Sequence, residues 1–203
     1  MGEVNVEDAR ASLMAWRRAE RERLLDLRMK MSVADRQQAS RQIEERLDAY
    51  CRDRGLLAPG RIVSGYWPLR GEPDLRPWLI RLNEEGMVTV LPVVVEKGTP
   101  LRFRRWTPGC AMEKGFWNIP VPAAPEEFTP EVLLAPVIGF DSRCYRLGYG
   151  GGYFDRTLEL VRAQGRTYHA IGIGLDTSRL PAFEALPHDI PLNAVVTPTT
   201  LIE

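Results

Sequence analysis

A glycine-rich segment at residues 140–156 carries the residue types best suited to chemistry. It reads FDSRCYRLGYGGGYFDR, with glycines at 148, 150, 151 and 152. Glycine lets backbone N–H groups turn inward with no Cβ in the way, and such amides at a helix N-terminus bind anions. Arg146 and Arg156 flank the glycines and add positive charge. The segment predicts a phosphate site, although a flexible turn and a helix cap would use the same residues.

Two common nucleotide motifs are excluded. No Lys-Ser or Lys-Thr pair follows the glycines, as a P-loop requires, and no GxGxxG pattern fits a dinucleotide fingerprint. The chain has three lysines, at positions 30, 97 and 114, and twenty-four arginines. Phosphate chemistry here would therefore rest on arginine, backbone amides and a metal ion.

The glycine-rich segment lies between a predicted strand and a predicted helix. The apolar run 132–140 is typical of a buried parallel strand, and a helix is expected at about 152–163. Further strands are predicted at 61–67, 87–95, 101–106 (exposed or at an edge), 168–175 and 194–197, with a short helix at 74–82 capped by Asp74. This alternation predicts an α/β fold, a three-layer sandwich with a mostly parallel, Rossmann-like sheet. Ligands of such sheets bind beyond the carboxyl ends of the strands, where the glycine-rich segment begins.

Two helices are predicted before the first strand. Apolar spacing indicates one helix at about 6–30, and Ser32 is expected to cap a second that runs to about Arg54. No linker isolates residues 1–55, so we expect a single domain over 1–203 with these helices packed on the same core. Recurrent prolines indicate that residues 107–130 form a loop.

Composition narrows the class of protein. The 203 residues carry 27 Lys+Arg and 27 Asp+Glu, a formal net charge of zero, which argues against a nucleic-acid partner. The longest uncharged apolar run is too short to span a bilayer, and the N-terminus lacks the apolar stretch of a signal peptide. Cys51, Cys110 and Cys144 lack metal-site spacing and are expected to be reduced thiols. We expect a cytoplasmic monomer without a membrane partner.

The chain resembles the 5-formyltetrahydrofolate cyclo-ligases, also called 5,10-methenyltetrahydrofolate synthetases. The resemblance rests on the glycine-rich segment, YWPLRGEPD at 66–74, LPVV at 91–94 and HDIPLNAVVT at 188–197, and it spans nearly the whole chain. It implies an enzyme of one-carbon metabolism that uses ATP and Mg²⁺ to cyclise 5-formyltetrahydrofolate to 5,10-methenyltetrahydrofolate, with release of ADP and phosphate. In that reaction ATP activates the N5-formyl oxygen as a phosphate ester, and N10 attacks the formyl carbon as phosphate leaves.

The resemblance also implies a role for particular residues. Arg146, Tyr149 and Tyr153 would take part in catalysis, and Asp155 and Asp189 would bind magnesium. The implied nucleotide-binding residues are Arg17, Arg21, Arg146, Leu147, Gly148, Tyr149, Gly150, Gly151, Gly152, Tyr153 and Phe154. The implied folate-binding residues are Trp67, Glu72, Tyr149, Gly150, Gly151, Gly152 and Tyr153, with Glu72 as the polar contact to the pterin and Trp67 as an apolar one.

Several positions depart from the pattern of that family. Cys144 stands where glycine is usual, Glu131 where aspartate is common, and Leu186 where glutamate is common, while residues 112–122 lack a usual glutamate. These departures keep two alternatives open. One is a paralogue that retains the nucleotide loop but acts on another substrate, for example in thiamine metabolism. The other is a non-catalytic protein that binds folate or nucleotide.

Overall fold

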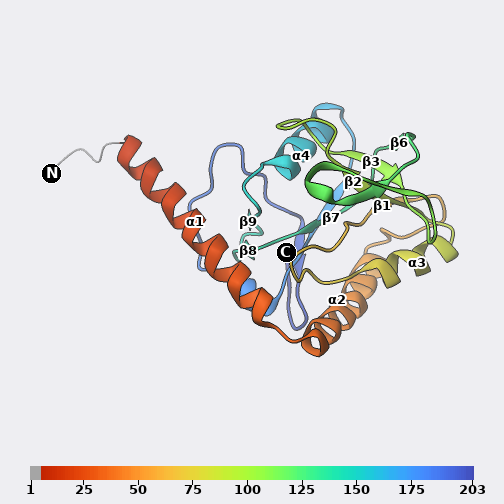
Figure 1. The fold of residues 1–203 in the computed structure, drawn as a ribbon, viewed down its shortest axis with the longest axis horizontal. Helices are drawn as coiled ribbons and strands as arrows, with labels where there is room; N and C mark the ends of the chain where they lie inside the picture. The colour runs from red at the N-terminus through yellow and green to blue at the C-terminus, as the bar shows by residue number, and fades with distance from the viewer. Residues whose placement is uncertain (1–5) are drawn as a thin grey trace.

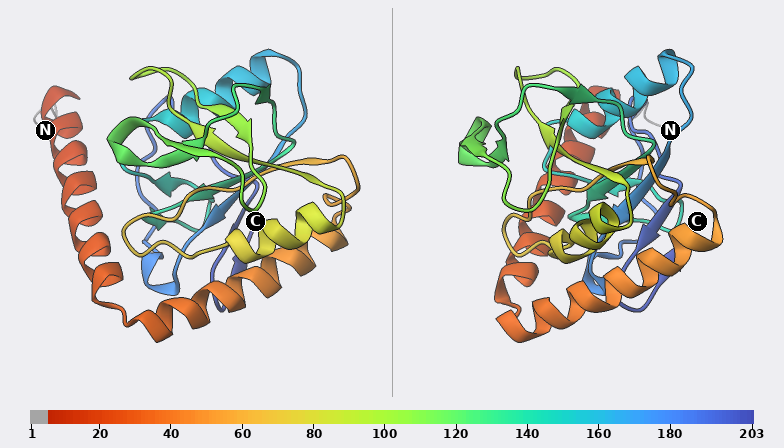
Figure 2. Two further views of the ribbon diagram at one scale, coloured as in Figure 1. Left: turned by 45° about the vertical axis from the view of Figure 1, so that its right-hand side comes forward. Right: turned by 90° about the vertical axis from the view of Figure 1, so that its right-hand side faces the viewer.

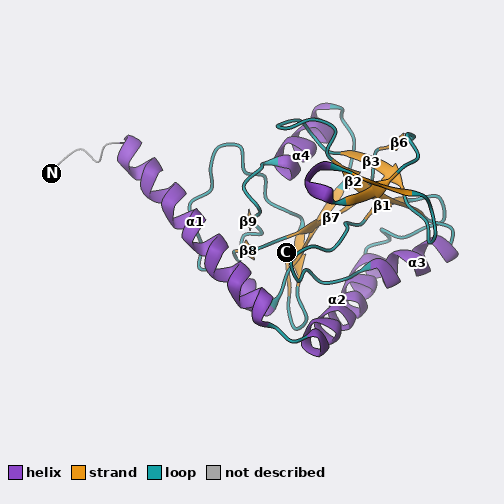
Figure 3. Ribbon diagram, viewed as in Figure 1, coloured by secondary structure: helices purple, strands orange, loops and turns teal. Residues whose placement is uncertain are grey.

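The computed structural model describes residues 6–203 and has a central sheet flanked by helices (Figure 1 and Figure 3). Its strands lie in the order β12-β11-β10-β7-β1-β2-β3-β6. Those from β11 to β2 are mutually parallel, and β12, β3 and β6 are antiparallel to their neighbours. The bounds are β1 Ile62–Ser64, β2 Val88–Val93, β3 Arg102–Arg105, β6 Glu127–Phe128, β7 Val132–Pro136, β10 His169–Ile173, β11 Ala194–Val196 and β12 Leu201–Ile202.

Helices cover both faces of this sheet (Figure 2). α2 (Val33–Asp53) and α3 (Arg76–Glu84) lie side by side on one face, and α4 (Tyr153–Ala163) lies on the other. Leu134 of β7 belongs to the core cluster that contains α2 and α3, whereas its neighbour Leu133 belongs to the cluster that contains Leu158 of α4. Side chains that alternate between two buried faces are the signature of a sheet between helical layers. The three-layer α/β prediction is confirmed.

α1 (Val6–Lys30) runs along one side of the molecule, and its N-terminal part extends away from the body (Figure 1). Its inner face contacts β8 (Gly139–Phe140), and Leu24 packs with Ile138 and Leu147 in a third core cluster. The predicted break before α2 is confirmed, because the Ser32 hydroxyl accepts a hydrogen bond from the Asp35 amide.

Some predicted elements differ in extent. The apolar run 132–140 divides, since β7 ends at Pro136 and β8 forms a separate hairpin with β9 (Arg146–Leu147). The strand predicted at 61–67 is limited to Ile62–Ser64. Asp74 lies outside α3, where it accepts a hydrogen bond from the Arg76 amide, and Leu75 occupies the N-cap. No helix within residues 6–203 combines the length and apolar character needed to cross a membrane.

The prediction that residues 107–130 form a loop is wrong in part. β4 (Met112–Lys114) pairs with β5 (Pro120–Pro122), and a 3-10 helix, η1 (Phe116–Asn118), lies at the tip of that hairpin. β6 then pairs with β3, so β3 is not the edge strand. The prolines that suggested a loop are tolerated because this hairpin has only two strands and each strand has an unpaired side.

Candidate active site

The glycine-rich loop connects β9 to α4 and leaves its amides free. Within residues 6–203, the N–H groups of 148–152 donate to no protein acceptor. Gly152 is the N-cap of α4, with φ of 65°, and no side chain caps the helix. Gly150 has φ of 91°, and a Cβ on Gly148 would meet no atom within 4 Å. Free amides, space and an uncapped helix N-terminus together fit the phosphates of a nucleotide.

Arg21 of α1 contacts this loop. Nε of Arg21 donates to the carbonyl oxygen of Gly148 at 2.7 Å, and its guanidinium carbon lies 3.5 Å from the position of a Cβ on Gly150. Burial, and then the positive charge of Arg17, lower the pKa of Arg21. A guanidinium held against a loop of free amides adds charge where phosphate would lie.

Arg146 joins the loop to the first turn of α4. Its Nη2 lies 2.5 Å from Oδ1 of Asp155, and its Nη1 donates to the carbonyl oxygen of Ile190 at 2.7 Å. Oδ1 of Asp155 also accepts a hydrogen bond from the Ile190 amide at 3.1 Å. Arg146 is 8% exposed, so its positive charge is nearly buried beneath the loop.

Asp189, the residue before Ile190, is held from α1. Arg17 is 4% exposed, and its Nη2 donates to Oδ2 of Asp189 at 2.5 Å and to the carbonyl oxygen of Glu184 at 3.0 Å. The same Oδ2 accepts from the Leu186 amide. Since Asp155 bonds to the amide that follows Asp189, the structure brings both predicted magnesium ligands to one segment.

Each of these two aspartates keeps one oxygen available. Among the described residues, Oδ2 of Asp155 and Oδ1 of Asp189 accept no protein hydrogen bond, and His188 is the nearest ion partner of the latter at 4.0 Å. Residues 6–203 hold no group of three or more His, Cys, Asp or Glu side chains arranged for a metal. Mg²⁺ often uses one or two carboxylates and keeps several waters. The donor set therefore fits a magnesium ion that is mainly ligated by water and substrate.

Glu72 lies buried in the loop after β1. Oε2 accepts from the Leu69 amide and Oε1 from the Tyr149 hydroxyl, both at 2.9 Å, and the side chain is 3% exposed. Burial raises the pKa of Glu72, and the two donors and the charge of Arg28 partly offset that rise. Burial and the Glu72 charge raise the pKa of Tyr149 in turn. The predicted folate contact and the glycine-rich loop thus meet directly.

The remaining predicted residues have other neighbours. Trp67 packs against the core, and the guanidinium carbon of Arg76 lies 4.7 Å from the centre of its ring. The Tyr153 ring meets Trp117, from the tip of the β4–β5 hairpin, with ring centres 5.8 Å apart. Trp117 is 58% exposed and has φ of 55°. The hairpin that departs from the family pattern therefore lies beside the loop.

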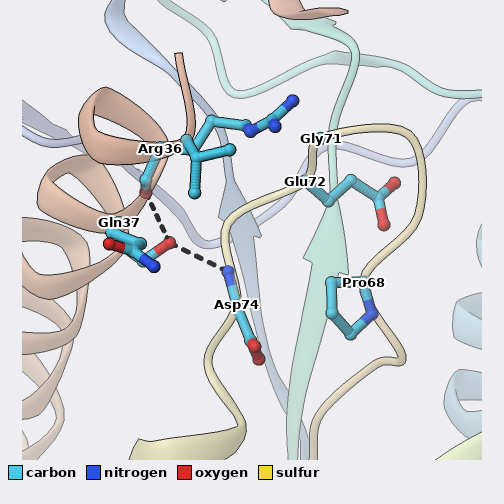
Figure 4. Close-up of a pocket in the computed structure, with 8 residues that line it drawn as sticks. Arg36, Gln37, Pro68, Gly71, Glu72 and Asp74 are labelled. Carbon is cyan, nitrogen blue, oxygen red and sulfur yellow. Dashed lines mark hydrogen bonds between the residues drawn. The ribbon is translucent and has the colours of Figure 1, made fainter. Parts of the chain in front are cut away.

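A small pocket adjoins the Glu72 loop on its α2 side (Figure 4). Its volume is about 180 Å³, less than the ~300–1,000 Å³ usual for ligand pockets. Ser40 bridges its wall, accepting from the Asp74 amide and donating to the Arg36 carbonyl oxygen. In Figure 4 the Glu72 and Asp74 carboxylates point in different directions. Glu72 lines this pocket and also bonds to Tyr149, so the pocket adjoins the glycine-rich loop through Glu72.

Two features of the site were missed from the sequence. Arg28 is 2% exposed and lies 3.7 Å from Glu72, a contact that the sequence did not predict. Cys144 has φ of 60°, a left-handed conformation that explains why glycine is usual there.

Comparisons with known proteins show the family to which the chain belongs. The sequence profile described as the 5-formyltetrahydrofolate cyclo-ligase family matches residues 13–198. The 5-formyltetrahydrofolate cyclo-ligase of Mycolicibacterium smegmatis is 35% identical over 152 residues, which cover 71% of this chain and 77% of that protein. The Escherichia coli enzyme of the same name is 30% identical over 147 residues, covering 70% and 80%.

Solved structures show the same fold. The 5,10-methenyltetrahydrofolate synthetase of Aquifex aeolicus aligns with a TM-score of 0.74 at 24% identity and covers 92% of this chain and 91% of its own. The synthetase of Mycoplasma pneumoniae aligns with a TM-score of 0.70 at 22% identity and covers 90% and 98%. Profile, sequence relatives and fold agree, and the chain is a member of the 5-formyltetrahydrofolate cyclo-ligase family of enzymes.

Proposed function

We propose that this protein catalyses the ATP- and Mg²⁺-dependent cyclisation of 5-formyltetrahydrofolate to 5,10-methenyltetrahydrofolate, ADP and phosphate. The observation that carries the proposal is the Tyr149–Glu72 hydrogen bond, which joins a loop suited to phosphates to a buried carboxylate suited to a pterin. The family and the names of its members support the substrate. We further propose that the protein is a monomer and is cytoplasmic, the latter supported by its three free cysteines.

The nucleotide end of the site would act by position and charge. The amides of 148–152 would cradle the phosphates, and Arg21 and Arg146 would stabilise the charge that develops as the γ-phosphoryl group moves. Asp155 and Asp189 would hold magnesium, which when bound neutralises phosphate charge. Arg17 would fix Asp189 in place, because it already binds that carboxylate from α1.

The folate end of the site would act by orientation. A carboxylate offers about four acceptor positions, so Glu72 retains capacity for pterin N–H groups beyond its bonds to Leu69 and Tyr149. Trp67 and the ring of Tyr153 supply apolar surface. Pterin bound here would present its formyl oxygen to the glycine-rich loop, and the loop would exclude water from the transfer of phosphate to that oxygen.

The direct test is turnover by the purified chain. Absorbance of methenyltetrahydrofolate should appear only when 5-formyltetrahydrofolate, ATP and Mg²⁺ are all present, with one ADP formed per product. A folded protein that binds ATP but gives no product from this folate would contradict the proposal and favour the paralogue. In that case residues 112–122 would be the place to look for altered specificity, since Trp117 lies against Tyr153.

A further inference from the structure

Arg28 is a buried cation that the proposed mechanism does not use. It lies in the last turn of α1, and its side chain is 2% exposed. Arginine keeps its charge in proteins and carries five N–H donors. A guanidinium so fully removed from water requires a counter-charge and acceptors, because burial of an isolated charge is unfavourable.

Two acceptors surround this guanidinium. Nη2 donates to the carbonyl oxygen of Val137, between β7 and β8, at 2.8 Å. Nη1 lies 3.7 Å from Oε1 of Glu72, which is ion-pair range but too long for a hydrogen bond. Nη1 and Nε make no hydrogen bond to any group within residues 6–203. One end of Arg28 is therefore anchored to the chain after β7, and unpaired donors lie next to the Glu72 carboxylate.

We propose that Arg28 is a positioning residue that holds the Glu72 carboxylate in place and ionised for folate binding. This inference rests on the proposed role of Glu72 as the pterin contact. Arg28 does not touch the substrate in this account. It acts through Glu72, whose side chain is 3% exposed and thus shielded from bulk water.

Arg28 is more deeply buried and more firmly anchored than the other partners of Glu72. Tyr149 is 45% exposed and lies in the glycine-rich loop. Its hydrogen bond to Oε1 of Glu72 therefore lies at the surface that the pterin would cover. The Leu69 amide orients only Oε2 and belongs to the same loop as Glu72. Arg28 comes from another element, is buried, and is anchored at Val137, so the position of its charge does not depend on Tyr149.

The charged and titratable groups that face Glu72 come from four elements. They are Arg28 of α1, Tyr149 of the glycine-rich loop, Tyr66 after β1, and Arg36 of α2, which lines the same pocket as Glu72. Burial raises the pKa of Glu72, and Arg28 lowers it. Loss of Arg28 should raise the pKa of Glu72 further. As the solution is acidified, folate binding by the variant should therefore weaken at a higher pH than folate binding by the wild type.

The test compares Arg28→Gln and Arg28→Lys by steady-state kinetics over about pH 5–8, a range that exposes an essential carboxylate. Arg28→Gln should raise the folate KM about tenfold, which corresponds to a loss of about 1.4 kcal/mol of folate binding free energy. The ATP KM should stay within about twofold of the wild-type value. The acidic limb of kcat/KM for folate should move to higher pH. Arg28→Lys retains the charge and should restore most of the folate KM and the original pH profile.

A double-mutant cycle separates this role from a structural one. If Arg28 acts through Glu72, adding Arg28→Gln to Glu72→Gln should change the folate KM by less than about twofold, whereas independent effects would multiply. The matched control is Arg18→Gln, an exposed arginine on the same helix, which should leave both Michaelis constants unchanged.

A folded Arg28→Gln variant with an unchanged folate KM and pH profile would overturn the inference, and so would a rise that multiplies with that of Glu72→Gln. If Arg28→Gln does not fold, the double variant decides. A folded double variant supports the coupling, because both buried charges are gone, and an unfolded one refutes it. Absence of turnover by the wild type would instead contradict the proposed function and remove the basis for this role.

Discussion

At the residue scale, Glu72 is a carboxyl group in buried surroundings that disfavour its charged form. Burial raises its pKa above the ordinary value of 4.5, and the nearby donors and Arg28 only partly compensate. A raised pKa in the folded state means that ionisation of this group lowers stability as pH rises. In the proposed function the ionised form of Glu72 contacts the pterin, so the site would trade stability for function.

The pH dependence of stability should reveal this trade. The Glu72 contribution is fully present below its unfolded pKa and is lost as pH rises through its higher folded pKa. The stability of the wild type relative to Glu72→Gln should therefore fall as pH increases from about 4 to 7. Urea denaturation at several pH values measures this difference, and a difference that stays constant or grows with pH would refute it.

A second prediction at the residue scale concerns the Arg17–Asp189 pair. Asp189→Asn should lower the free energy of unfolding by about 3 kcal/mol, because it leaves the charge of Arg17 buried without its partner. The matched control is Asp26→Asn, whose partner Lys30 is 70% exposed, and its effect should lie within the error of denaturation curves. Equal effects of the two variants would contradict a buried ion pair.

The resemblance singled out some residues of the site and missed others. Arg17 binds Asp189 and Arg21 binds the glycine-rich loop, and the nucleotide-binding role that the resemblance implied for both stays a prediction. The role of Arg28 could not be predicted, because its surroundings depend on where Val137 and Glu72 lie after folding. The left-handed backbone of Cys144 could not be predicted either, because cysteine is not a residue type that usually adopts this conformation.

At the scale of elements, the glycine-rich loop depends on backbone shapes that only glycine adopts easily. Gly150→Val should weaken ATP binding more than tenfold by calorimetry, since φ is 91° and the new side chain would lie against Arg21. Gly165→Val is the matched control, with φ of 66° and no atom within 4 Å of a Cβ. It should incur similar backbone strain without weakening ATP binding, and equal losses of affinity would contradict a phosphate site at the loop.

The placement of α1 is the second prediction at this scale. Leu24→Ala should destabilise the fold by about 2–4 kcal/mol and raise the ATP KM, because Leu24 packs α1 against Ile138 and Leu147 and so positions Arg17 and Arg21. Leu27→Ala on the same helix removes a side chain that is 40% exposed and should do neither. An unchanged ATP KM in Leu24→Ala would show that α1 does not contribute to the site.

The prediction of elements succeeded for the long helices and failed for the short hairpins, whose strands pair with neighbours close in the sequence. The extents of α1, α2 and α4 agree with the predicted helices, and the start of α2 follows from its Ser32 cap. The run 132–140 could not reveal its division, because uniform apolar burial leaves no periodic signal at the point where β7 ends and β8 turns away. The β4–β5 hairpin, rich in proline, had the composition of a loop.

At the scale of the whole molecule, the site is assembled from segments far apart in the chain. Arginines of α1, the loop after β1, the loop before α4 and the segment around Asp189 meet along one side of the sheet. The fold class followed from the alternation of strands and helices, whereas these contacts required the structure. The single domain expected for residues 1–203 stays a prediction, supported by the packing of α2 within the main core cluster.

The central claim is that one site has a nucleotide end at the glycine-rich loop and a folate end at Glu72. The most direct measurement is the pair of Michaelis constants for 5-formyltetrahydrofolate and ATP in Glu72→Gln beside the wild type. A charge-assisted contact to the pterin contributes about 1.5–3 kcal/mol, so the folate constant should rise roughly ten- to a hundredfold. The ATP constant should change by less than about twofold, because Glu72 is assigned no contact with phosphate. An unchanged folate constant, or an equal rise in both constants, would contradict the account.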